Sequence, residues 1–235
     1  MIDHYDWAGG REAMLRFGPD TGPVVIAAMP LFEEANRTRA FIVSILRMLA
    51  GHGVATALPD LPGTGESLTE TEYASVKNWN KAFSSAVDFL KLDSRPIHAV
   101  AIRGGVLVDT RAAVASRWHF APVAGEGVVR DMLRARQAAA MESGETIGVE
   151  TIAPPGPPIE LAGNRLSRAL LAELQNSLRL REPPLRTVRL DTDPLPADRH
   201  VAGAPLWRRS EPGNDPDLAR LLADDIAAWI ATCAG

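Results

Sequence analysis

Short apolar runs alternate with helical patterns throughout the first half of this chain. Residues 23–30, PVVIAAMP, have no polar residue among them, which is typical of a strand buried on both faces of a sheet. Residues 36–52 then repeat apolar side chains at helical spacing and end beside two glycines. The same succession recurs twice more. The pattern predicts an α/β fold, with a mostly parallel central sheet and helices on both of its faces.

The whole set of expected elements follows from the same patterns. Strands are expected at 23–30, 53–58, 97–102, 119–123, 146–152, 185–190 and 200–204, and helices at 36–52, 73–90, from 106 onward, 128–141, 166–178 and 217–231. A chain of 235 residues, 46% of them hydrophobic, can bury one sizeable core. We therefore expect a single domain over residues 1–235, with room for a small cap or insertion around residues 125–180.

Charge and cysteine content exclude several classes of protein. The 25 Lys and Arg are scattered and the net charge is −4, which argues against nucleic-acid binding. Cys233 is the only cysteine, so the chain has neither an internal disulfide nor a cysteine metal cluster. No segment reaches the roughly 18 apolar residues of a membrane span, and the first residues do not resemble a signal peptide. We expect a cytoplasmic protein without a membrane span, cofactor or metal.

A glycine-rich turn follows the second expected strand. Residues 60–67, DLPGTGES, place two glycines where the chain leaves the carboxyl edge of the sheet. Glycine allows backbone angles that other residues avoid, and Ser67 can cap the next segment. This motif is common in α/β-hydrolases, where it shapes the loop rather than carrying out chemistry.

Several further segments resemble one narrower group of proteins. With residues 30–39, PLFEEANRTR, ahead of the glycine-rich turn, the chain resembles the exosortase-A-system-associated hydrolases of bacterial exopolysaccharide genes. The second type of that family is also similar at residues 101–105, 118–136, 159–163 and 202–207. The sequence departs from the family pattern at Leu31 and Ala101. The resemblance implies an α/β-hydrolase fold, a hydrolase ancestry and partners among exopolysaccharide-system proteins.

The position of the nucleophile is the decisive feature of the sequence. In an active hydrolase of this fold, the turn after a central strand reads G-x-S-x-G. Here residues 101–105 read AIRGG, and Arg103 stands in place of the serine. A guanidinium stays protonated and cannot act as a nucleophile. None of the five histidines is expected at the carboxyl edge after the last strand, where the triad base belongs. Asp191 or Asp193 could fill the place of the acid, but would have no histidine to orient.

Arg103 has two compatible interpretations. With the N–H groups of Gly104 and Gly105 and the neighbouring Leu31 and Phe32, it could bind a carboxylate, sulfate or phosphate. Alternatively, it forms a buried ion pair with Glu33, Glu34 or Asp60, all expected at the same edge of the sheet.

Three functions therefore remain open. The first is a catalytically degenerate protein, or pseudoenzyme, that binds a small anionic or carbohydrate-derived ligand near Arg103, Gly104, Leu31 and Phe32. The second is an active ester or thioester hydrolase, in which Glu33, Glu34 or Asp60 activates a water molecule. The third is an interaction protein of the exopolysaccharide system, which rests on the family resemblance alone.

Overall fold

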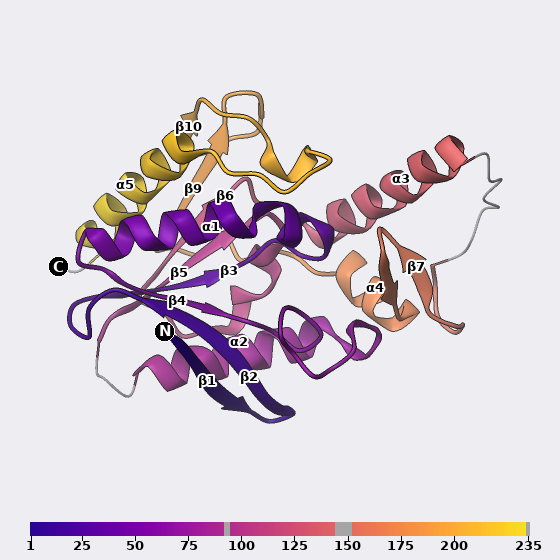
Figure 1. Ribbon diagram of the computed structural model, residues 1–235, viewed down its shortest axis with the longest axis horizontal. Coiled ribbons are helices and arrows are strands. Elements are labelled where there is room, and N and C mark those ends of the chain that lie inside the picture. The colour runs from indigo at the N-terminus through magenta and orange to yellow at the C-terminus, as the bar shows by residue number, and fades with distance from the viewer. Residues whose placement is uncertain (92–94, 144–151, 234–235) are drawn as a thin grey trace.

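A central sheet is the core of the computed structural model, which describes residues 1–91, 95–143 and 152–233 (Figure 1). Its strand order is β1-β2-β4-β3-β5-β6-β9-β10. The strands are β1 (Ile2–Trp7), β2 (Gly10–Phe17), β3 (Val24–Ala28), β4 (Ala55–Pro59), β5 (Ile97–Ile102), β6 (Ser116–Phe120), β9 (Leu185–Leu190) and β10 (Arg199–Val201). From β4 to β10 all neighbours are parallel, whereas β1 and β2 add an antiparallel hairpin at one edge. The predicted mostly parallel sheet is confirmed.

Helices cover both faces of this sheet. The helices are α1 (Glu33–Gly51), α2 (Val76–Lys91), α3 (Gly125–Ser143), α4 (Arg168–Gln175) and α5 (Pro216–Thr232). Figure 1 shows α1 and α5 side by side on one face and α2 on the other. Successive residues of β3 point to opposite faces, so Val25 packs with α1 and α5 while Ile26 packs with α2. This double burial explains the continuous apolar runs in the sequence.

Two parts of the structure differ from the sequence expectations, and one expected strand falls largely outside the described residues. The helix expected from residue 106 is wrong: two short 3₁₀ segments, Arg103–Leu107 and Asp109–Arg111, occupy the connection from β5 to β6. That connection is close to the shortest possible parallel crossover, which leaves little length for an α-helix. The β1–β2 hairpin was not expected, because its strands are mostly polar and few of their side chains are buried. The strand expected at 146–152 lies, except for Ile152, outside the described residues.

The chain between β6 and β9 lies beyond the carboxyl ends of the strands (Figure 1). It contains α3, α4 and an unexpected hairpin of β7 (Ile159–Leu161) and β8 (Asn164–Leu166). Gly125 begins α3 so close to α4 that an added Cβ would lie 1.7 Å from the carbonyl oxygen of Leu174. Only glycine permits this contact, which fixes α3 above the end of the sheet. No helix among the described residues has the length and apolar character needed to cross a bilayer.

Candidate functional site

A sharp turn at the end of β5 forms the centre of the site. Arg103 follows the strand directly and adopts a left-handed backbone conformation with φ 54°. Such a conformation costs a non-glycine residue about 1 kcal/mol. Gly105 lets the turn approach β3, since an added Cβ would lie 2.4 Å from the carbonyl oxygen of Ala28 and 2.5 Å from that of Met29. The turn therefore has the strained shape of a nucleophile elbow, with arginine at its apex.

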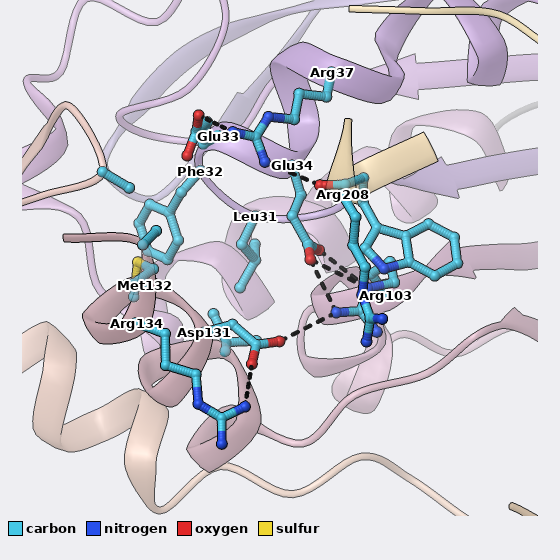
Figure 2. Close-up of a pocket in the computed structure, with 14 residues that line it drawn as sticks. Leu31, Phe32, Glu33, Glu34, Arg37, Arg103, Asp131, Met132, Arg134 and Arg208 are labelled. Carbon is cyan, nitrogen blue, oxygen red and sulfur yellow. Dashed lines mark hydrogen bonds and ion pairs between the residues drawn. The ribbon is translucent and has the colours of Figure 1, made fainter. Parts of the chain in front are cut away.

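Two carboxylates bind the guanidinium of Arg103 (Figure 2). Its Nη2 lies 2.9 Å from Oε1 of Glu34, and its Nε lies 3.2 Å from both oxygens of that carboxylate. The same Nη2 lies 3.4 Å from Oδ2 of Asp131, on α3. Only 12% of the Arg103 side chain is exposed. A half-buried ion pair thus occupies the place of the catalytic serine.

An indole ring supports the other side of this guanidinium. Cζ of Arg103 lies 4.7 Å from the ring centroid of Trp207, which belongs to the 3₁₀ segment Leu206–Arg208 after β10. The indole is itself held edge to face by Phe120, with 5.9 Å between ring centroids. A cation over an aromatic face is stabilised by the quadrupole of the ring. Arg103 therefore has an aromatic support as well as two anionic partners.

The other two carboxylates considered from the sequence lie apart from Arg103. Glu33 forms an i,i+4 ion pair with Arg37 on α1, and both side chains line the cavity beside Arg103 without contacting it. Asp60 accepts a hydrogen bond from the backbone N–H of Glu66 at 3.0 Å and lies 3.5 Å from Nη1 of Arg39. Of the three candidates only Glu34 reaches Arg103. Adjacent residues at the start of a helix point in different directions, which separates Glu33 from Glu34.

Burial and the charge of Arg103 shift the pKa of Glu34 in opposite directions. Burial raises the pKa of its carboxyl group above the ordinary value, and the nearby Asp131 adds to that rise. The charge and hydrogen bonds of Arg103 lower the same pKa. Arg103 therefore offsets part of the rise that burial causes, and the pKa of Glu34 stays above its ordinary value.

A cavity of about 450 Å³ opens beside this ion pair (Figure 2). Its lining comes from the start of α1, from α3, from the turn between β7 and β8, and from the 3₁₀ segment after β10. Leu31 and Phe32 line it together with Arg103, and Leu31 also packs on Gly104, whose added Cβ would lie 3.1 Å from its Cγ. The four residues proposed as a ligand site are thus brought together. Asp60 lines a second cavity, of about 790 Å³, which shares Leu31 and Phe32 with the first.

Comparisons with known proteins place this architecture. No protein-family model and no curated protein matches the sequence significantly. Among solved structures, Est1E from Butyrivibrio proteoclasticus, with ferulic acid bound, is 18% identical, with a TM-score of 0.64 over 97% of this chain and 99% of that one. The thioesterase domain of the curacin biosynthetic pathway is 15% identical, with a TM-score of 0.60 over 97% and 99%. The fold is that of the α/β-hydrolases.

A third neighbour widens the range of chemistry found on this α/β-hydrolase fold. An AqdC variant, solved in a study of recognition and ring cleavage of the Pseudomonas quinolone signal, is 12% identical. Its TM-score is 0.62, over 99% of this chain and 100% of that one. At such identities the likeness establishes the α/β-hydrolase fold, and function must be argued from the site.

The five histidines lie elsewhere in this α/β-hydrolase fold, and none of them is in the segment after β10. Nε2 of His119 lies 2.9 Å from Oδ2 of Asp109, and both side chains are fully buried. Nδ1 of His98 lies 2.8 Å from Oγ of Ser116 near the opposite end of the sheet. His200 is exposed and contacts backbone carbonyls of its own loop. His4 lies in β1 and His52 caps the end of α1.

The loop that would carry the base of an active α/β-hydrolase holds Trp207 instead. Asp193, which follows β9 as the acid of a triad would, forms an ion pair with Arg189 at 2.5 Å. No serine, histidine and acid therefore come together among the described residues. Nor do three or more potential metal-ligating side chains meet in that part of the chain.

Sequence reasoning missed two functional neighbours of Arg103. Asp131 is a polar residue on α3 and only the packing of that helix brings it to the elbow. Trp207 lies in the segment after β10, and its contact with Arg103 carries no sequence signal.

Proposed function

We propose that this protein is a catalytically degenerate α/β-hydrolase-fold protein that binds a small anionic or carbohydrate-derived ligand in the cavity beside Arg103. The observation that carries the proposal is the elbow itself. A protonated guanidinium, held by Glu34 and Asp131 and supported by Trp207, fills the space that a serine and its histidine require.

The ligand site we propose consists of Arg103, Gly104, Leu31 and Phe32. We also propose that the region around residues 125–180, as far as the structure describes it, acts as a cap, because Val128, Asp131 and Met132 of α3 form one wall of the cavity. Caps of this kind shield a ligand from water. The single cysteine supports placing the protein in the cytoplasm.

The alternative is an active ester or thioester hydrolase that uses a carboxylate-activated water. Each candidate carboxylate is engaged by an arginine: Glu33 by Arg37, Glu34 by Arg103, and Asp60 by Arg39. A carboxylate held by an arginine is not free to turn toward a water molecule, which favours the binding function. The third function, an interaction protein of the exopolysaccharide system, rests on the resemblance at residues 30–39, and a pull-down with those proteins would test it.

Two assays test the proposed function. Wild type and Arg103→Ser are incubated with p-nitrophenyl acetate, an acyl thioester and a fluorophosphonate probe. We expect neither turnover nor labelling, because Arg103→Ser supplies a hydroxyl without a base to take its proton. Rapid turnover by Arg103→Ser would reveal an overlooked base. Turnover by the wild type that Asp60→Asn abolishes would select the alternative.

A binding experiment tests the other half of the proposal. Ferulic acid, which is bound in the Est1E structure, is a suitable first compound. We expect it to raise the melting temperature of the wild type in proportion to the logarithm of its concentration. Substitution Leu31→Trp, which fills the cavity beside Gly104, should remove that shift. A shift that persists in Leu31→Trp would place the ligand elsewhere.

A further inference from the structure

The charges that line the cavity beside Arg103 do not balance. Four arginines and three carboxylates contribute to its wall: Arg37, Arg103, Arg134, Arg208, Glu33, Glu34 and Asp131. Glu33 is paired with Arg37, and Glu34 with Arg103. These two pairs are neutral as units and leave little charge for a ligand.

The remaining three groups carry one excess positive charge. Asp131 lies 3.4 Å from Nη2 of Arg103 and 4.0 Å from Nη1 of Arg134, so Arg134 has a carboxylate beside it. The side chain of Arg208 is exposed and, within the described residues, has neither an ion-pair nor a hydrogen-bond partner. The wall thus carries a net charge of one, and Arg208 is the group free to receive an anion.

The side of the cavity away from Arg208 is mostly apolar, with Arg134 near Met132 as its charged group (Figure 2). Leu31, Phe32, Val128, Met132 and Ala162 contribute hydrocarbon and aromatic surface there. In Figure 2, Phe32 and Met132 lie on one side while Arg103 and Arg208 lie on the other. This segregation favours a ligand with a charged end and an apolar body over one that is polar throughout.

We infer that the cavity binds an organic monoanion with an apolar tail, of which a medium-chain carboxylate is the simplest example. The guanidinium of Arg208 receives the carboxylate, and the tail lies against Leu31, Phe32 and Met132. This inference rests on the proposed binding function and specifies its ligand class. A volume of about 450 Å³ lies within the range of small-molecule sites.

Isothermal titration of the full chain with octanoate and octanamide tests the anion. The two compounds have nearly the same shape and differ in charge. We expect octanoate to bind the wild type about tenfold more tightly at low salt, because a hydrogen bond to a charged group contributes more than one to a neutral group. The preference for octanoate over octanamide should become smaller in 0.5 M NaCl, because salt screens the charge of the exposed Arg208.

Substitution of the anchoring arginine provides the second arm. Arg208→Ala should weaken octanoate about tenfold and remove the preference over octanamide, whereas Arg208→Lys should keep part of it. Arg209→Ala is the matched control, because Arg209 is an exposed neighbour that does not line the cavity. It should bind octanoate as the wild type does.

The hydrocarbon length of the carboxylate provides the third arm of the test. Affinity should rise about fourfold per methylene from hexanoate to octanoate, as apolar surface enters the cavity. Equal affinity for octanoate and octanamide, no effect of Arg208→Ala, or no binding of octanoate would each overturn the inference. Ferulic acid binding without ester turnover would meanwhile leave the proposed function intact, so the two failures are distinguishable.

Discussion

The guanidinium of Arg103 lies 4.7 Å above the indole of Trp207, and this contact joins the turn after β5 to the segment after β10. In an active enzyme of this fold the same two places hold the nucleophile and its base. Here they are linked by a cation–π contact, while Glu34 and Asp131 bind the edges of the same guanidinium. At these two positions the protein has a cross-link between separate parts of the chain.

Removal of this cross-link should weaken the fold. Arg103→Ala leaves the Glu34 carboxylate without its principal cation, and we expect the free energy of unfolding to fall by about 3 kcal/mol. Urea titration monitored by circular dichroism measures the change. Arg220→Ala is the control, since its i,i+3 pair with Asp217 is highly exposed and should contribute little. Equal stability of Arg103→Ala and the wild type would reject a structural role for the ion pair.

The close approach of the elbow to β3 leads to a second prediction. Gly105→Ala would place Cβ within 2.5 Å of two backbone carbonyl oxygens, neither of which can turn away. We expect a loss of about 2–3 kcal/mol in thermal or urea unfolding. Gly51→Ala is the matched control, because Gly51 ends α1 with open space around it and should tolerate alanine or gain slightly in stability. An unchanged melt of Gly105→Ala would show that the elbow can move away from β3.

A buried carboxylate on α5 leads to a pH prediction. Asp225 accepts hydrogen bonds from Nε1 of Trp118 at 2.8 Å, from Arg186 at 2.8 and 2.9 Å, and from Arg199 at 2.6 Å. Although burial opposes ionisation, these partners lower its pKa from 3.8 to about 2. The folded state therefore holds this proton less tightly than the unfolded chain does. The resulting stabilisation, about 2 kcal/mol, is complete above the unfolded pKa and is lost as the pH falls toward 2.

Asp225→Asn isolates this contribution. We expect it to be destabilised by about 2 kcal/mol at pH 7, with a difference from the wild type that shrinks steadily below pH 4. Urea unfolding at pH 7, 4 and 3 follows the difference. Asp217→Asn, on the exposed first turn of the same helix, is the control and should leave stability nearly unchanged. A difference that stays constant with pH would mean that the loss comes from packing rather than from ionisation.

Regular elements with strong apolar patterns were predictable from the sequence. Strands β5 and β9 have the expected bounds, because their runs are bounded by turn residues and face other strands on both sides. Helix α1 begins at Glu33 rather than at residue 36, since the helical pattern of apolar residues starts only after the first turn. The β7–β8 hairpin was missed, because three-residue strands are too short to show a period.

The site was predictable only in outline. The motif at residues 101–105 located Arg103 at the elbow, and three acids were expected near it. Which acid would bind depended on the direction of each side chain, which the first turn of α1 sets for Glu33 and Glu34 and the loop after β4 sets for Asp60. Asp131 lies on a different helix and Trp207 much farther along the chain, so no local pattern links either of them to Arg103.

The left-handed turn is present at Arg103 although no serine stands there, and Gly105 packs closely on β3 within the same turn. The strained main chain thus belongs to the scaffold and does not depend on catalysis. Among proteins of this architecture, backbone shape at the apex of the turn marks where a nucleophile could stand. The residue type at that apex has to be read as well before an esterase activity is assigned.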